Sequence, residues 1–183
     1  MRGKNWVALG LLLSLFGTCQ LVVARRPNQE AVVPVGEYSD MKIDADHCSG
    51  RALQIWKSGD KLYGLFLVCE GLAGDTPTGL LEETKWNPET SQLSFTAHLT
   101  IGSDVLESGK QVPSRDEFNF AGTLKENIAE GTLRSVDKAI AGAEPATINV
   151  RLSKRKSDMK GFASYRRWKM AADRVLAVRG PKW

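Results

Sequence analysis

The sequence lacks the short motifs that mark many cofactor-dependent and catalytic folds. It contains no G-x-x-x-x-G-K-[ST] phosphate loop, no G-x-G-x-x-G turn and no G-x-S-x-G nucleophile elbow. We therefore expect neither a nucleotide cofactor nor an α/β-hydrolase type of active site. Histidine is scarce, with two residues in the chain, so candidates for metal ligation or a catalytic triad are few. The sequence predicts no cofactor and no metal centre.

Cysteine is also scarce: there are three residues and no C-x-x-C redox pair. The first, Cys19, lies in a stretch with the layout of a secretory signal peptide, because Arg2 and Lys4 precede an apolar run over 6–16 and small residues end at Ala24. We therefore expect residues 1–24 to be a signal peptide and the mature chain to be secreted or periplasmic. Two less favoured alternatives stay open, namely lipidation at Cys19 and an uncleaved membrane anchor over 6–24.

Removal of residues 1–24 would leave two cysteines, Cys48 and Cys69. In an oxidising compartment an even pair of this kind predicts a disulfide. The surrounding pattern supports the pairing, because strands over 52–57 and 61–69 flank a tight turn. If Ser58 and Gly59 form a two-residue hairpin loop, unbroken pairing would place Cys48 opposite Cys69.

Short alternating segments separated by turn residues run through most of the chain, which is typical of antiparallel β structure. After a lead-in over 25–45 that is punctuated by prolines and Gly36, we expect one β domain over 46–183. The clearest strand has an apolar face made by Leu93, Phe95, Ala97, Leu99 and Ile101. Further strands are expected over 78–86, 118–124, 128–136 and 147–153, with Gly122 and Gly131 nearly opposite at a bend of the sheet.

These elements predict an all-β fold, an antiparallel meander of about seven or eight strands, most simply closed as a small barrel. A β-sandwich is the alternative. The outline is similar to that of lipocalin-type barrels, which bind small apolar molecules, although the G-x-W opening of that family is missing. This resemblance concerns the fold alone.

A single helix is expected at the end of the chain, over 165–179. Ser164 is a suitable N-cap, Gly180 a suitable C′ residue and Pro181 a stop. Its apolar stripe contains Tyr165 and Trp168, which predicts a helix packed on the β domain. A basic amphipathic helix lying on a membrane surface is the less favoured interpretation.

Charge divides the chain into an acidic body and a basic tail. Residues 25–150 carry 12 Lys or Arg against 19 Asp or Glu, a net charge of −7, whereas residues 151–183 carry 11 against 2, a net charge of +9. The favoured explanation is that the tail docks on its own body. The alternative is a basic surface for an anionic partner, with contacts from Arg166, Arg167, Trp168 and Arg174. Nucleic acid is not expected as a partner of an exported protein.

Three aromatic residues, Trp56, Tyr63 and Trp86, are the candidate ligand-binding set, since aromatics at a barrel mouth suit apolar ligands. The leading hypothesis is therefore an exported, non-enzymatic binding module for a small lipophilic or cell-envelope ligand held in the β body, with the helix as a lid. The alternative is an envelope-associated interaction protein that uses the basic helix on an anionic surface or a protein partner. Least favoured is a hydrolase using the acidic residues around 70–83. The Asp44–His47 cluster and the lone His98 are interpreted as solvated surface groups.

Overall fold

The structure is a computed structural model that describes residues 30–72, 74 and 76–182. The predicted signal peptide and Cys19 lie outside these residues. The strands and the helix are, in chain order, β1 Val33–Ser39, β2 Lys42–Asp44, β3 His47–Ser58, β4 Lys61–Leu72, β5 Thr78–Leu80, β6 Glu82–Asn87, β7 Gln92–Leu99, β8 Ser103–Val105, β9 Gln111–Pro113, β10 Asp116–Lys125, β11 Ile128–Asp137, β12 Ala146–Arg155 and α1 Tyr165–Arg179.

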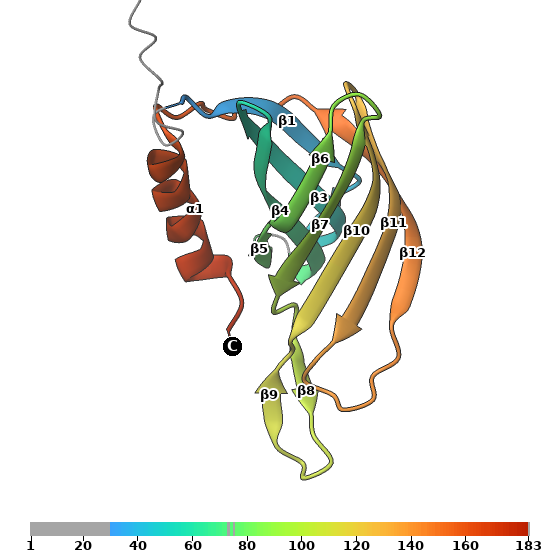
Figure 1. Cartoon of the computed structure of the whole chain (residues 1–183). Coiled ribbons are helices and arrows are strands. Elements are labelled where there is room, and N and C mark those ends of the chain that lie inside the picture. The colour runs from blue at the N-terminus through green and yellow to red at the C-terminus, as the bar shows by residue number, and fades with distance from the viewer. Residues whose placement is uncertain (1–29, 73, 75, 183) are drawn as a thin grey trace, which may run out of the picture.

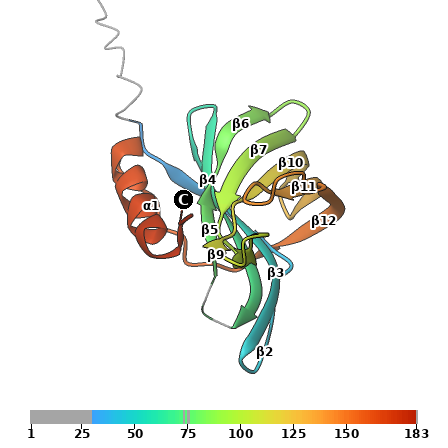
Figure 2. The same cartoon turned by 90° about the horizontal axis from the view of Figure 1, so that it is seen from below.

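Ten of these strands form one antiparallel sheet that curls into a nearly closed barrel (Figures 1 and 2). The strand order is β5-β4-β3-β1-β12-β11-β10-β7-β6, and β2 adds to β3. The two ends of this order meet at Leu81, where one extended segment passes from pairing with β4 to pairing with β7. The backbone N–H of Leu81 donates to Gly64 O at 3.0 Å. The predicted all-β barrel is confirmed.

The strand count is higher than the sequence predicted. The expected strand over 78–86 is divided at Leu81 into β5 and β6, and β6 has a register shift at Glu83, whose φ is +48°. Three short strands were also missed: β2, next to β3, and the β8–β9 hairpin, which extends from one end of the barrel (Figure 1).

The first barrel strand comes from the segment that the sequence assigned to a lead-in. Strand β1 pairs with β3 on one side and with β12 on the other, so it joins the early and late parts of the sheet. Tyr38 on β1 is buried in the core. Pro34 and Gly36 flank a register shift at which β1 is irregular, which explains why its alternation is hard to recognise. The β domain therefore begins before residue 46.

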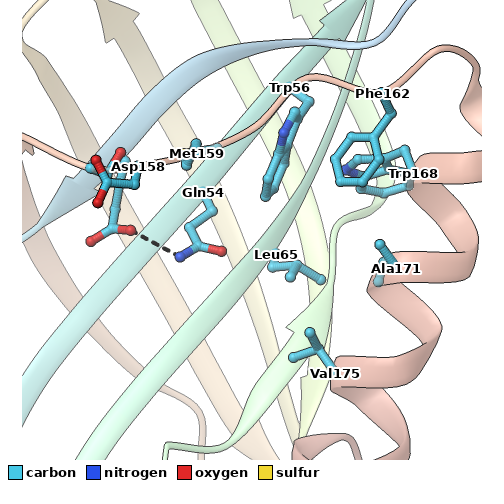
Figure 3. A pocket seen from close by; sticks show the side chains of 12 residues that line it. Gln54, Trp56, Leu65, Asp158, Met159, Phe162, Trp168, Ala171 and Val175 are labelled. Atoms are coloured by element: carbon cyan, nitrogen blue, oxygen red, sulfur yellow. Dashed lines mark hydrogen bonds between the residues drawn. The ribbon is translucent and has the colours of Figure 1, made fainter.

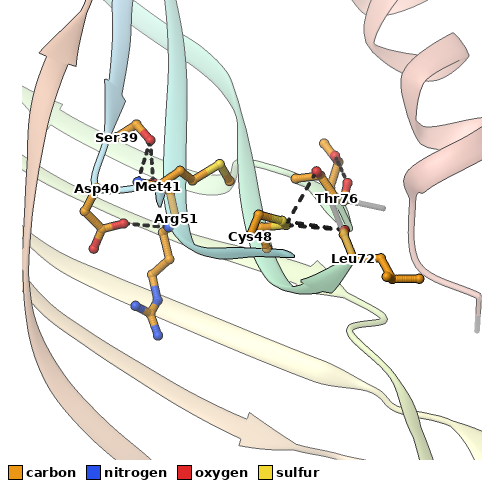
Figure 4. Close-up of a disulfide and its surroundings, with 9 residues drawn as sticks. Ser39, Asp40, Met41, Cys48, Arg51, Leu72 and Thr76 are labelled. Carbon is orange, nitrogen blue, oxygen red and sulfur yellow. Dashed lines mark hydrogen bonds between the residues drawn. A yellow bond between two sulfur atoms is a disulfide. The ribbon is translucent and has the colours of Figure 1, made fainter. Parts of the chain in front are cut away.

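The β3–β4 hairpin has a different register from the one predicted. Ser58 pairs with Lys61, so the loop is Gly59-Asp60, and Gly59 adopts a φ of +56°. Cys69 consequently lies opposite Gly50 rather than opposite Cys48. The two cysteines are diagonal neighbours with Cα atoms 5.7 Å apart, and they form the predicted disulfide (Figure 4).

Inward-facing side chains from the whole barrel fill its interior. Phe66 packs against Phe95 and Phe118 at ring-centroid distances of 5.7 and 5.4 Å, and Phe95 stacks on Phe120 at 5.1 Å. Aliphatic residues from strands on every side, including Leu53, join the same cluster. The barrel interior is therefore a packed apolar core.

The glycine pair predicted at a bend is confirmed. Gly122 pairs with Gly131 across β10 and β11. A Cβ atom added to Gly122 would lie 2.2 Å from Glu130 O, and one added to Gly131 would lie 2.3 Å from Ala121 O. Glycine is needed here because the two backbones approach each other too closely for a side chain.

The C-terminal helix has the predicted bounds and lies outside the barrel wall, close to β4 and β5 (Figure 1). The Ser164 hydroxyl accepts the backbone N–H of Arg167 at 3.4 Å, as expected of an N-cap. Gly180 ends the helix with a φ of −75°, so it does not use the left-handed region. A side chain there would collide with Leu176 O, at 2.4 Å from an added Cβ.

Candidate functional site

A second apolar cluster lies outside the barrel, between α1 and the outer faces of β3 and β4. It exists because these two strands alternate: Ile55 and Phe66 point into the core, whereas Trp56 and Leu65 point outward. Val32, which precedes β1, and Trp168 and Ala172 from the helix complete the buried part of this cluster. Strands β3 and β4 are thus apolar on both faces, and α1 covers the outer one.

Aromatic contacts fix the helix against the wall. Trp168 is 2% exposed, and its ring centroid lies 6.0 Å from that of Trp56 and 5.2 Å from that of Tyr63. Tyr165 packs on Tyr63 at 4.7 Å. The indole N–H of Trp56 donates to Lys160 O at 2.9 Å, which ties the segment between β12 and α1 to the same wall. Both indole rings are therefore held in defined orientations.

Beside this cluster a groove of about 350 Å³ runs between α1, the wall and the segment before the helix (Figure 3). We call it the helix groove. Apolar and aromatic side chains make most of its surface. Its lining consists of Glu37, Gln54, Trp56, Leu65, Ser157, Asp158, Met159, Phe162, Trp168, Ala171, Ala172 and Val175.

Polar groups collect at one end of the helix groove. Gln54 lies opposite Glu37 across β3 and β1, and its amide nitrogen donates to Glu37 Oε2 at 2.9 Å. Asp158 lies at this same end, away from Trp168 and Val175 (Figure 3). The groove thus has an apolar end beneath the helix and an acidic end near the start of the segment that leads to it.

No family model, curated protein or solved structure matches this chain. Within residues 30–72, 74 and 76–182, no helix is long and apolar enough to cross a membrane. In the same part of the chain no group of three or more His, Cys, Asp or Glu residues is placed to hold a metal ion. A ligand of the helix groove would have to match its apolar end and its acidic end.

The three aromatics predicted to bind a ligand do not share one site. Trp56 and Tyr63 are cross-strand partners on the outer wall, and Trp56 lines the helix groove. Trp86 lies on β6 and packs partly against the core. Together with Tyr63 and Tyr165 it lines a separate cleft of about 400 Å³. None of the three points to a ligand inside the barrel.

Several groove residues were not predicted. Phe162 and Met159 belong to the irregular segment before the helix, where no periodicity marks them. Phe162 is held by a β-bridge to Val32, with backbone N–H···O distances of 2.8 and 2.7 Å. Glu37 was missed because it falls in the segment over 25–45 that the sequence predicts as a lead-in. The sequence of β4 does carry a signal for this wall. Tyr63, Leu65 and Leu67 alternate with core residues, which indicates a strand covered by apolar groups on both faces.

The residues predicted to contact a partner separate into two groups. Trp168 is buried beneath the helix, as the docked-helix interpretation requires, so it is not available to a partner. Arg166, Arg167 and Arg174 are exposed and make no ion pair within the described residues. The ion pair seen on α1 joins Lys169 to Asp173 of the same helix. Apolar packing, rather than charge pairing with the acidic body, therefore docks the basic helix.

His98 lies in a charged network on the outer face of the sheet. Its Nδ1 is 3.3 Å from Glu82 and its Nε2 is 3.7 Å from Glu117, which also contacts Lys138 at 3.5 Å. Burial opposes ionisation of Glu117, but the hydrogen bond from Asn119 and the charges of Lys138 and His98 together lower its pKa. Thr96 donates to Asn119 rather than facing His98 as a nucleophile. His98 thus lies between two carboxylates, those of Glu82 and Glu117, on the outer face of the sheet.

The remaining acidic candidates are dispersed. Glu70 lies 4.0 Å from Arg51, and Glu83 occupies the irregular part of β6. Asp75 lies outside the described residues. Asp44 and His47 pair across the β2–β3 turn, where both are exposed. The described acids of this group make separate contacts, Glu70 with Arg51 and Glu82 with His98.

A pair of carboxyl groups lies near the β8–β9 hairpin. Asp137 accepts hydrogen bonds from the backbone N–H groups of Arg115 and Ala139 at 3.0 and 2.8 Å. Burial alone would raise the pKa of Asp137, but the hydrogen bonds to its carboxylate outweigh this effect and lower the pKa. Asp104 faces this carboxylate, and its Oδ2 is buried without a hydrogen-bond partner among the described residues. A proton held between Asp104 and Asp137 would satisfy this oxygen, and this pairing, followed by burial and the charges of Asp137 and Asp116, raises the pKa of Asp104 to about 6.

Stability should consequently depend on pH through Asp104. Because its pKa is raised, Asp104 binds its proton more tightly in the folded state than in the unfolded state. The stability gained from this proton is therefore complete below the ordinary aspartate pKa of 3.8 and is lost as the pH rises through about 6. Asp104→Asn supplies a permanent donor to Asp137. We expect urea unfolding to show the variant about 1 kcal/mol more stable than the wild type at pH 7.5, a magnitude reduced by the partial exposure of Asp104. The difference should shrink at pH 4.5; an equal difference at both values would contradict this account. Asp46→Asn is the charge-matched control.

Proposed function

We propose that this protein is a non-enzymatic binding protein that holds a small lipophilic ligand in the helix groove. The observation that carries the proposal is the groove itself, which is apolar, has aromatic walls and measures about 350 Å³. Ligand sites commonly have volumes from about 300 Å³ upward, with mostly apolar linings and a few convergent polar groups. The site therefore lies between the barrel and its helix, whereas the barrel interior is occupied by Phe66, Phe95 and their neighbours.

The helix has a defined part in this proposal. It forms one wall of the groove through Trp168, Ala171 and Val175, while the other wall belongs to β3 and β4. A ligand would thus be enclosed between the wall and the helix, beside the segment over 156–164 that connects β12 to α1. We further propose that the mature chain works outside the cytoplasm, with which the Cys48–Cys69 disulfide is compatible.

Fluorescence of the neutral lipophilic probe N-phenyl-1-naphthylamine tests this proposal. The wild-type protein, prepared as residues 25–183 from an export-competent host, should give a saturable increase in probe emission. Ala171→Trp places a large ring in the groove and should abolish the increase. Ala177→Trp makes the same change at an exposed position of α1 and should leave binding intact. Absence of saturable binding to the wild type, or equal binding by both variants, would overturn the proposal.

A second candidate function is favoured by the outer face of α1. Because Arg166, Arg167 and Arg174 are exposed without ion pairs in the described part of the chain, they present positive charge that an anionic envelope surface would attract. We expect cosedimentation with phosphatidylglycerol vesicles and none with phosphatidylcholine vesicles at low salt. Changing the three arginines to glutamine should abolish it, while leaving binding of the naphthylamine probe unchanged. Failure of the wild type to cosediment would exclude this second function.

A further inference from the structure

We infer that the helix groove selects amphiphilic ligands whose polar head is a cation, an ammonium or a guanidinium group. This inference rests on the proposed function and adds the chemical class of the ligand. It follows from the polar end of the groove, where the groups that face a ligand accept hydrogen bonds and carry negative charge.

Hydrogen-bond direction is the first observation. The amide nitrogen of Gln54 is directed to Glu37, to which it donates, and this leaves the carbonyl oxygen of Gln54 facing the groove (Figure 3). The carboxylates of Glu37 and Asp158 offer further acceptors at the same end. The indole N–H of Trp56 is already satisfied by Lys160 O. A head group that donates hydrogen bonds therefore fits these acceptors, whereas a carboxylate or phosphate would be repelled by Glu37 and Asp158 and would find a side-chain donor only in the Ser157 hydroxyl and the second N–H of the Gln54 amide.

Charge is the second observation. The lining contains two acidic residues, Glu37 and Asp158, and no Lys, Arg or His among the described residues. Arg155 lies opposite Glu37 across β12 and β1 but makes no ion pair with it within the described residues, and neighbouring Lys154 places its Nζ 5.8 Å from the centre of the Tyr38 ring. Neither basic side chain lines the groove. A cationic head would supply the opposite charge that the lining lacks.

The apolar end sets the rest of the ligand. From Gln54 and Asp158 the groove continues to Leu65, Trp168 and Val175 (Figure 3). An alkyl or aromatic tail attached to the cationic head would be covered by these side chains and removed from water, which favours binding roughly in proportion to the apolar area buried. The acidic end and the apolar end of the groove together fit one molecule with a cationic head and an apolar tail.

Calorimetric titration with three probes that share one tail tests the inference: octylammonium, 1-octanol and octanoate. We expect octylammonium to bind the wild type about fivefold more tightly than octanol, the upper end of the ratio that an exposed or half-buried charge pair gives, and octanoate to bind most weakly. Glu37→Gln should reduce this preference while leaving octanol affinity unchanged. Asp158→Asn changes an exposed side chain and should reduce the preference without affecting the fold. Glu89→Gln, an exposed acid on the β6–β7 turn, is the matched control.

The outcomes separate this inference from the proposed function. If the three probes bind the wild type equally and neither charge-removing variant matters, the cationic class is wrong while a lipophilic groove remains. If octanol and octylammonium both fail to bind, the proposed function is wrong as well. If octylammonium binds but Ala171→Trp does not block it, the cation is bound elsewhere and the inference is overturned.

Discussion

Replacing Trp168 with alanine should lower the free energy of unfolding by about 3–5 kcal/mol, the usual cost of removing a large buried aromatic side chain. Trp168 is 2% exposed and contacts Trp56, Tyr63 and Tyr165. Phe162 also packs on Trp56, at a ring-centroid distance of 6.3 Å, but removing the Trp168 ring would leave a cavity in the contact between the helix and the barrel. Urea unfolding followed by far-ultraviolet circular dichroism measures the change.

The matched control is Val178→Ala on the same helix. Val178 is 73% exposed, so its truncation should alter the free energy of unfolding by less than about 0.5 kcal/mol. Limited proteolysis gives a second readout, because a loosened helix should be cleaved near residues 156–164 before the barrel is attacked. Equal stability of the Trp168 and Val178 variants would show that α1 contributes little to the fold, and the helix groove would then lack a fixed wall.

Local pattern was sufficient for most of the fold. Residues Leu93 to Leu99 alternate between core and surface as predicted, since a strand with one solvated face repeats every two residues. The helix was found with its bounds because Ser164 and Gly180 enclose an apolar stripe. In both cases the signal lies within one element and does not depend on distant residues.

The hairpin register shows where local pattern stops. The predicted loop Ser58-Gly59 and the observed loop Gly59-Asp60 are both two-residue turns that contain glycine. Changing from one loop to the other moves the partner of each β3 residue by two positions along β4. A slip of one residue would exchange the faces of the strand, but a slip of two preserves them. Alternation therefore could not distinguish the two registers. The backbone resolves them, because Gly59 takes the positive φ at the first loop position.

The candidate site was less predictable than the fold because the groove is assembled from distant segments. Glu37 comes from β1, Gln54 from β3, Met159 from an irregular segment and Val175 from the helix. No spacing in the sequence connects them. The predicted aromatic set is divided for a related reason: Trp56 lines the helix groove with residues of α1 and the segment before it, whereas Tyr63 and Trp86 line the separate cleft beside Tyr165.

Removal of the disulfide should have the second large effect. Cys48 and Cys69 are both buried and separated by 21 residues, and they link β3 to β4 beside the β2–β3 turn (Figure 4). Closing a loop of this length restricts the unfolded chain and should stabilise the fold by about 3 kcal/mol. We expect Cys48→Ala combined with Cys69→Ala to lower the guanidinium unfolding midpoint accordingly.

Reductant provides the control for that result. The wild type should lose a similar stability when reduced, whereas the double variant should be insensitive to reductant, since it holds no bond to break. A reduced wild type that unfolds at the oxidised midpoint would contradict the assignment. The core clusters contain Leu53, Phe66 and Trp168 but neither cysteine. We therefore expect the double variant to keep the barrel and its docked helix, and to bind the naphthylamine probe while folded, because the bond acts on the unfolded chain and lies apart from the groove lining.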